Sequence, residues 1–162
     1  MIRVSRLADY GVVLACHIAG HPGQCHNAYD LAEVTGLPAP TVSKLLAALA
    51  KTGILTSIRG AKGGYRLARD PSQITAADIV TAVDGPIALT ICLEEGNVGA
   101  CDVESLCPTR HGWHRLNEAI RAALASVPIS ELAPAMPVRA PLPWPAAEAV
   151  AAPATAPSLA KS

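Results

Sequence analysis

The 162-residue chain contains no phenylalanine, and only 3% of its residues are aromatic. Because 51% of the residues are hydrophobic, the chain can still bury a core, which we expect to consist mainly of Leu, Ile, Val and Ala. No apolar run approaches the roughly 20 residues that span a bilayer, and the segment MIRVSRLADY lacks the apolar centre of a signal peptide. We therefore expect a cytoplasmic protein with one domain, or with one domain and appendages, and no membrane contact.

The residue patterns that mark an enzyme are also missing. The chain has no glycine-rich phosphate loop, no nucleophile paired with a base, and no second set of metal ligands beside its cysteines. The cysteines number five, an odd count, and thiols stay reduced in the cytoplasm. The sequence thus predicts a protein that is not an enzyme and whose cysteines are ligands or core residues rather than disulfide partners.

Acidic residues are absent from one long stretch, although the net charge of the chain is zero. Residues 44–69 contain six cations and no acid. The cations are Lys44, Lys51, Arg59, Lys62, Arg66 and Arg69. A stretch of one sign beside a neutral remainder is typical of a surface that binds a polyanion such as DNA, and a merely solvated surface is the alternative.

The first third of the chain carries the signals of three helices, at residues 6–19, at residues 28–35 and from Pro40 to Gly53. Ser5 suits the N-cap of the first helix, whose apolar stripe is Leu7, Tyr10, Leu14 and Ile18. A tight TGLP turn separates the second helix from the third, which is the outline of a helix-turn-helix. Three polar residues are expected on or near the exposed N-terminal face of its second helix: Thr41, Ser43 and Lys44.

The pattern changes after Gly53, where ILTSIRGAKGGYRLA consists of two β-like runs around a glycine-rich turn. This is typical of a β-hairpin, or wing, and its turn carries Arg59 and Lys62. A plain hairpin needs neither cation, whereas both suit contacts with phosphates or with the minor groove. We therefore predict a mainly α fold with a small β-hairpin wing, in which residues 1–71 form a winged helix-turn-helix DNA-binding domain.

Residues 72–132 are expected to form a second functional region, with a short helix beginning at Thr75 and a longer one from Pro108 to Ser126. The apolar residues of the longer helix recur at gaps of three and four: Trp113, Leu116, Ile120, Leu124 and Val127. Such a stripe needs a partner surface, and we expect a second copy of the same helix in a homodimer, since dimers match two half-sites on DNA. Residues 133–162 contain eleven Ala and seven Pro without a period, which predicts a disordered tail.

Three cysteines, Cys92, Cys101 and Cys107, share a glycine- and acid-rich segment at the spacing C-x8-C-x5-C. This spacing differs from the paired cysteines of zinc ribbons and from the ferredoxin signatures. The helix that follows Cys107 is expected to lower the pKa of its thiol through the helix dipole. Three thiolates could then hold a metal centre with a fourth, non-cysteine donor. Unrelated small core residues are the alternative, which fits Cys16 and Cys25 better.

Several segments together resemble the winged-helix iron–sulfur regulators typified by IscR and NsrR, and most closely the group that controls SUF cluster-assembly genes. They are LADYGVVLA, DLAEVTGLPAPTVSKLLAALAKTGILTSIRGAKGGYRLARD, ITAADIVTAVDGPIALTIC and CPTRHGWHRLNEAI. The resemblance that they carry covers about residues 1–132. The resemblance implies a homodimeric transcription factor, usually a repressor, in which Cys92, Cys101 and Cys107 hold an iron–sulfur cluster. We favour a 2Fe–2S cluster over a 4Fe–4S cluster. The loss or the chemistry of that cluster would change the affinity for promoter DNA.

The resemblance also bears on the fourth cluster ligand. IscR-like members have a histidine three residues after the third cysteine, where this chain has Arg110, and His111 follows one residue later. In NsrR-like members an aspartate near the start of the first helix reaches across the dimer, and Asp9 matches that residue. A helix advances about 100° per residue, so His111 would point away from the direction of the family's histidine. We therefore favour Asp9 over His111.

Two other functions stay open on the sequence alone. A thiol-redox or zinc-ligated transcriptional regulator could have the same DNA-binding half and would contain no iron or sulfide. A small iron–sulfur electron carrier, of a different functional class, would leave the basic wing without a role and would not retard promoter DNA.

Overall fold

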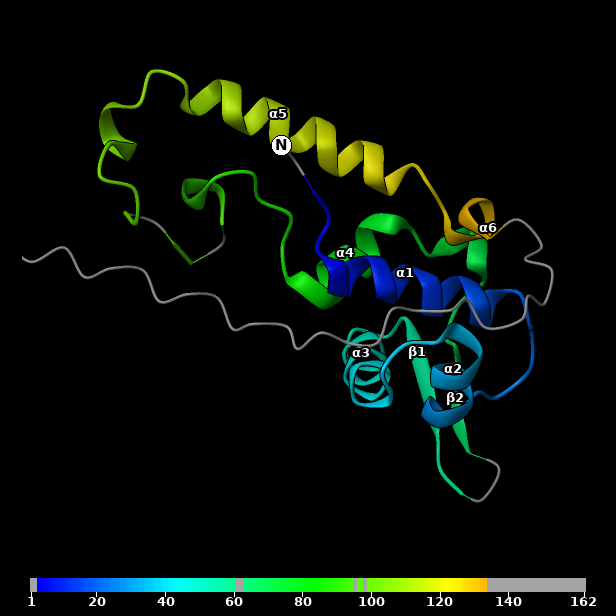
Figure 1. Ribbon diagram of the computed structural model, residues 1–162. Helices are drawn as coiled ribbons and strands as arrows, with labels where there is room; N and C mark the ends of the chain where they lie inside the picture. Colours follow the sequence, from blue (N-terminus) through cyan, green and yellow to red (C-terminus); the bar gives the residue numbers. More distant parts are fainter. Residues whose placement is uncertain (1–2, 61–62, 95, 98, 134–162) are drawn as a thin grey trace, which may run out of the picture.

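The structure is a computed structural model that describes residues 3–60, 63–94, 96–97 and 99–133 (Figure 1). Lys62 and the tail from residue 134 onward lie outside the described residues, and so do the predictions made for them. None of the helices in the described ranges combines the length and the apolar character that a membrane span requires.

Three helices come first in the chain: α1 (Arg6–Ala19), α2 (Ala28–Thr35) and α3 (Ala39–Lys51). The hydroxyl oxygen of Ser5 accepts a hydrogen bond from the Ala8 amide at 3.0 Å, which begins α1. Gly36 ends α2 with a φ of 70°, a left-handed conformation that glycine adopts without steric cost. Since α2 and α3 pack against each other across this turn, the structure confirms the predicted helix-turn-helix.

The wing is a two-stranded antiparallel sheet of β1 (Leu55–Ile58) and β2 (Gly64–Leu67). Two further backbone hydrogen bonds, of 2.9 and 2.8 Å, join Tyr65 in β2 to His26 in the loop between α1 and α2. A Cβ atom at Gly64 would lie 2.6 Å from the carbonyl oxygen of His26, so only glycine permits this approach. The second strand of the hairpin is therefore attached to the loop between α1 and α2.

The core is aliphatic, as the composition predicts, and contains no aromatic side chain among its fully buried residues. The largest fully buried side chains of the described residues are Leu14, Leu31, Val42, Leu45, Leu46, Leu49, Ile54, Ile74, Ile79 and Ile129. Burying such side chains supplies the main driving force for folding.

The buried face of α1 differs from the predicted stripe at its first position. Leu7 is 38% exposed, whereas Ala8 and Gly11 are buried. The reason is the close approach of the helix α4 (Ala76–Asp84), because a Cβ atom at Gly11 would lie 3.1 Å from a methyl carbon of Val83 and 3.2 Å from one of Ile79. Small residues rather than Leu7 thus face the neighbouring helix.

The second half of the chain contains α4 (Ala76–Asp84), α5 (Arg110–Ala125), α6 (Ile129–Leu132) and three single-turn 3-10 helices. The 3-10 helices are η1 (Pro71–Gln73), η2 (Ile91–Leu93) and η3 (Glu104–Leu106). Thr75 and Asp78 form the predicted capping box at the start of α4, with reciprocal hydrogen bonds of 2.9 and 3.2 Å. The predicted long helix begins two residues after Pro108, at Arg110.

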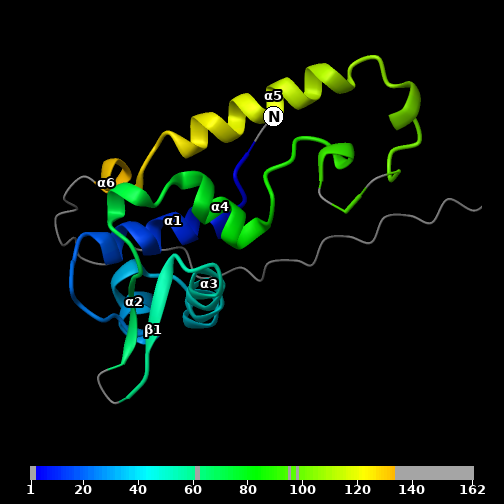
Figure 2. The same ribbon diagram turned by 180° about the vertical axis from the view of Figure 1, so that it is seen from behind.

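The chain leaves the core after α4 and returns to it at α6. The Ala76 amide donates to the Val127 carbonyl at 3.0 Å, and the Ile129 amide donates to the Ile74 carbonyl at 2.8 Å. Figures 1 and 2 show α5 running above α1 and α4, with the cysteine segment (residues 91–109) at one end of α5 and α6 at the other. Asn117 is the buried residue of α5, so most of this helix faces outward.

Candidate DNA-binding surface and cysteine segment

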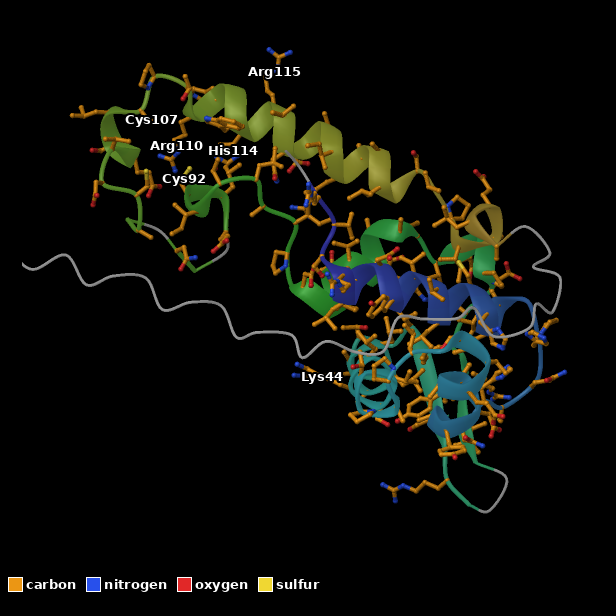
Figure 3. The ribbon with its side chains drawn as sticks, in the orientation of Figure 1. Lys44, Cys92, Cys107, Arg110, His114 and Arg115 are labelled. Atoms are coloured by element: carbon orange, nitrogen blue, oxygen red, sulfur yellow. The ribbon has the colours of Figure 1, made fainter. Side chains whose placement is uncertain are left out.

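The N-terminal part of α3 presents polar side chains on the side opposite the core. Ser43 and Lys44 are exposed and Thr41 is half-buried, while Val42 and Leu45 between them face inward. Figure 3 shows Lys44 extending from α3 away from the body of the molecule. The helical period thus separates the predicted contact residues from the buried residues of the same helix.

The cations that follow Lys44 are mostly free of intramolecular ion pairs. Among the described residues, Lys44, Lys51, Arg59 and Arg66 form no salt bridge, whereas Arg69 lies 4.0 Å from Asp78 and donates to the Gln73 carbonyl at 3.3 Å. Arg59 is exposed directly after β1, at the start of the wing turn. Unpaired positive charge on α3 and the wing is available to a polyanion.

The three cysteines of the cysteine segment are half-buried and free. Cys92 lies in η2, where its sulfur is 3.2 Å from the Thr90 hydroxyl, and the sulfur of Cys107 is 3.3 Å from the Thr109 hydroxyl. Figure 3 shows Cys92 and Cys107 at the end of the molecule where α5 begins. Within the described part of this single chain, no three His, Cys, Asp or Glu side chains are placed so that they could hold a metal ion.

Cys107 has the acidic thiol that the sequence predicts, but the main cause is different. The hydrogen bond from the Thr109 hydroxyl is the largest influence that lowers the pKa of Cys107, followed by the backbone at Thr109 and then by Arg110. The predicted cause was the dipole of the following helix, which begins only at Arg110. Cys16 behaves oppositely, because burial in the core raises the pKa of its thiol.

The two candidates for a fourth ligand are both exposed. Asp9 lies in the first turn of α1, and His111 lies in the first turn of α5. Neither joins the cysteines of its own chain in a metal site. Arg110, at the position where the resemblance leads one to expect histidine, instead forms a salt bridge of 3.1 Å with Glu104. That glutamate also accepts a hydrogen bond from the Gly99 amide at 2.8 Å, so Arg110 has a structural role in the segment.

Asn117 is a site residue that the sequence reasoning missed. It is 5% exposed, and its side chain holds the chain just before the cysteine segment. Its Oδ1 atom accepts a hydrogen bond from the Leu89 amide at 3.0 Å, and its Nδ2 atom donates to the Ile87 carbonyl at 3.1 Å. The available signal was a polar residue four positions after Trp113, within the apolar stripe of the long helix.

Comparison with known sequences gives a family match over most of the chain. The profile of the Rrf2 family, described as an iron-dependent transcriptional regulator, matches residues 4–135. The HTH-type transcriptional regulator IscR of Xenorhabdus nematophila is 35% identical over 103 residues, which are 64% of this chain and 61% of that protein. The HTH-type transcriptional regulator CymR of Bacillus subtilis is 29% identical over 133 residues, 82% of this chain and 90% of that protein. The match with IscR relatives thus covers 61% of their length.

Solved structures show the same architecture. CymR, the global cysteine regulator of B. subtilis, matches with a TM-score of 0.63 and 29% identity over 82% of this chain and 97% of the other. The IscR of T. potens matches with a TM-score of 0.60 and 30% identity over 81% of this chain and 85% of the other. These matches confirm the predicted winged helix-turn-helix fold, and they are to transcriptional regulators, which are not enzymes.

Replacing Asn117 with Ala should release the segment around Leu89 from α5. We expect faster hydrogen exchange at the Leu89 amide and a loss of about 1–3 kcal/mol in the free energy of unfolding, because a buried hydrogen-bonding partner is removed. Asn97→Ala is the matched control, since among the described residues the Asn97 side chain bonds with Glu94 in its own turn. Unchanged exchange at Leu89 in the Asn117 variant would contradict the role of this residue.

Proposed function

The chain belongs to the Rrf2 family of transcriptional regulators, and from this membership we propose that it is a homodimeric regulator whose affinity for promoter DNA depends on an iron–sulfur cluster. The observation that carries the proposal is the combination of two separate features in one chain. Unpaired cations lie on α3 and the wing, and three half-buried cysteines, one with a lowered pKa, lie in a segment joined to the same core.

DNA binding is assigned to residues 1–71. We place the N-terminal part of α3 in the major groove, where Thr41, Ser43 and Lys44 are exposed enough to reach base edges or phosphates. Arg59 and Lys62 would contact the phosphates or the minor groove beside it. Support comes from the separation of polar and buried residues around α3 and from the exposure of Arg59 at the start of the turn.

Dimerisation is assigned to α5, within residues 72–132. Trp113 is 40% exposed and Leu116 is 44% exposed, and both continue a stripe that includes the half-buried Ile120 and Leu124. Large apolar side chains in such a row lose contact with water when a second copy of the helix covers them. A twofold dimer would also place two copies of α3 on successive half-sites of an operator.

Cys92, Cys101 and Cys107 are the proposed cluster ligands, and their chemistry fits that role. Thiolates are the usual ligands of iron–sulfur clusters, and the hydrogen bond from Thr109 favours the thiolate of Cys107. Gly96 and Gly99 both have positive φ angles, which permit the tight turns between the first two cysteines. A bound cluster would supply redox chemistry and a site for small oxidants, while the chain would hold it and limit the access of solvent.

Asp9 of the partner subunit is the proposed fourth ligand, with His111 as the competitor. Asp9 is exposed and off the buried face of α1, so packing within the chain does not explain it. A carboxylate is a harder and weaker donor to iron than a thiolate, which would leave one iron open to attack. This ligand would connect the cluster to a helix that packs against α3. From the resemblance we propose a 2Fe–2S cluster, with a 4Fe–4S cluster as the alternative, and a role in the control of SUF assembly or related stress genes.

A regulator without a cluster is the second candidate. It is favoured by the likeness to CymR, which covers 82% of this chain and is the cysteine regulator of its own organism. In that case the same DNA-binding half would respond through cysteine thiols or a zinc ion. Anaerobic analysis of iron and acid-labile sulfide in the purified protein separates the two candidates.

The central test is an anaerobic visible spectrum and a promoter-binding assay on one preparation, before and after removal of the cluster. We expect iron–sulfur absorption bands that disappear on removal, and a change in DNA affinity of roughly 5- to 150-fold, the usual range of coupling between two sites. A protein that lacks iron and sulfide, or whose DNA affinity is the same in both forms, would contradict cluster sensing.

Arg59→Ala should weaken operator binding by roughly 1–3 kcal/mol if the side chain reads a base, while Lys62→Ala should mainly lower the salt dependence of binding, by about one unit of slope. The measurement is a set of binding isotherms at several salt concentrations. Arg115→Ala is the control, since Arg115 extends from the outer side of α5 (Figure 3). Wild-type isotherms in both wing variants would remove the wing from the interface.

Asp9→Ala should shorten the lifetime of the cluster in air and change the visible spectrum of the anaerobic protein, because one ligand to iron is lost. His111→Ala, compared under the same conditions, should retain the wild-type spectrum and lifetime. If the Asp9 variant matches the wild type while the His111 variant loses its cluster, the ligand is His111.

A further inference from the structure

Three histidines, which we call the histidine cluster, lie together at the end of α1 and in the loop that follows it. His17 lies in the last turn of α1, His21 lies just beyond the helix, and His26 precedes α2. The ring centroids are 4.7 Å apart for His17 and His21, and 5.6 Å apart for each of the other two pairs. Neither the hydrophobic core nor the proposed DNA contacts explain why three imidazoles are gathered here.

The histidine cluster surrounds the point at which the wing is attached to the helices. His26 and Tyr65 of β2 exchange two backbone hydrogen bonds, of 2.9 and 2.8 Å. The backbones are in close contact there, because a Cβ atom at Gly64 would lie 2.6 Å from the His26 carbonyl oxygen. His26 therefore cannot move toward solvent without giving up the contact with the wing.

The ring of His26 is placed so that only its neutral form is accommodated. His26 is 9% exposed, and its Nε2 atom is buried without a hydrogen-bond partner among the described residues. A proton added at Nε2 would create a charged N–H group where the described structure offers it no acceptor. Because a buried and unpaired charge is far costlier than one in water, a protonated His26 ring gains free energy by reaching solvent.

The other two rings make a further charge in the histidine cluster unfavourable. The Nδ1 atom of His21 lies 2.9 Å from the carbonyl oxygen of His17, and since a carbonyl only accepts, this nitrogen donates. The bond holds the His21 ring at the end of α1, with its centroid 5.6 Å from that of His26. A positive charge on His21 or His17 therefore repels one on His26.

The pKa shifts of two of the rings agree with this geometry. Burial is the largest cause of the lowered pKa of His26, followed by the charge of His21, and Asp30 and a hydrogen bond with the His21 backbone act in the opposite direction. Burial, followed by the charges of His21 and His26, lowers the pKa of His17. Both rings thus bind a proton less readily in the folded protein than in an unfolded chain.

The charged groups around the histidine cluster compensate a new positive charge only in part. Asp30, in the first turn of α2, is the acid among them, and its carboxylate already accepts a hydrogen bond from the Asn27 side chain at 2.6 Å. Arg66 lines the same groove as His21 and adds positive charge. The surrounding titratable and charged groups are Cys16 of α1, Cys25 of the loop, Asp30 of α2, Tyr65 and Arg66 of β2, and Arg69 after β2.

We propose that the histidine cluster is a proton-sensitive attachment of the wing, in which protonation releases His26 from Tyr65 and frees the second strand of the hairpin from the loop after α1. A histidine in an opened segment has its ordinary pKa of about 6.5, whereas the closed cluster holds the pKa of His26 lower. The opened form therefore binds more protons. The attachment is complete above about pH 6.5 and is lost progressively as the pH falls below that value.

The consequence for DNA rests on the proposed function. A wing released from the loop would hold Arg59 less firmly beside α3, so the affinity for an operator should fall in mildly acidic solution. Figures 1 and 2 agree that the loop after α1 and the cysteine segment lie at opposite ends of the molecule. The response to protons is therefore physically separate from the proposed cluster site.

The test measures amide hydrogen exchange of the full chain without DNA, at constant salt, at about pH 5.5 and about pH 7.5, which bracket the ordinary pKa of histidine. Each rate is compared with the intrinsic rate at the same pH. We expect the protection of the His26 and Tyr65 amides to fall by about fivefold or more at the lower pH, the lower end of typical couplings between two sites. The Ala68 amide, which donates to the Ile54 carbonyl at 3.0 Å, should keep its protection. Equal protection at the two pH values, or an equal loss at Ala68, would overturn the proposal.

Three variants assign the effect to the histidine cluster. His26→Gln should remove the pH dependence of exchange at Tyr65, since the ionisable ring is gone. His21→Gln leaves His26 in place and should reduce the pH dependence, because the largest charge acting against protonation of His26 is lost. His114→Gln, at an exposed histidine on α5, is the matched control and should behave as the wild type. A pH dependence of wild-type size in both cluster variants would rule out these rings as its source.

Promoter binding by the same proteins separates this inference from the proposed function. Between about pH 7.5 and about pH 5.5, the wild type should lose about fivefold more affinity than His26→Gln at the same salt concentration. Absence of DNA binding at both pH values would contradict the proposed function, while the exchange result would still support the proton-sensitive attachment. Exchange that is independent of pH in a protein that binds DNA would overturn the attachment alone.

Discussion

Two backbone hydrogen bonds, from Ala76 to Val127 and from Ile129 to Ile74, determine the shape of the second half of this molecule. They join the start of α4 to the start of α6, and Ile74 and Ile129 beside them are fully buried. The residues between these points, which include the cysteine segment and α5, form a long connection whose two ends are held together at the core. This connection can therefore extend away from the core while both of its ends stay fixed to it.

This arrangement gives the cysteine segment a short physical connection to the DNA-binding half. The helix α4 packs against both α1 and α3, and the close approach at Gly11 leaves little room for α4 to shift without moving α1. At the other end, Asn117 fastens residues 87–89 to α5. A change that displaces either end of the cysteine segment would therefore also displace α4, which packs against α1 and α3.

Membership of the Rrf2 family accounts for the winged helix-turn-helix but leaves the sensing chemistry to the details of the chain. Both IscR and CymR relatives align with it at similar identity. The residues of the cysteine segment at which this chain departs from the expected pattern are informative here. Arg110 is paired with Glu104, so it serves the folding of the segment, and the acidity of Cys107 arises mainly from Thr109. These contacts within the chain shape the cysteine segment.

The sequence alone determined the features that depend on neighbours within a few residues. The cap at Ser5, the capping box at Thr75 and the glycine end of α2 each involve groups at most four positions apart, so their spacing is visible in the sequence. The family-like wing motif and the cysteine spacing were likewise visible. Only the tertiary structure decided which face of α1 is buried, that Asn117 binds Leu89, and that His26 meets both Tyr65 and two other histidines. The contacts at Gly11, Asn117 and Tyr65 join residues that are distant in the chain, and the three histidines are brought together by an irregular loop that has no period. Hydrophobic periodicity, for its part, specifies a buried face without specifying what will cover it.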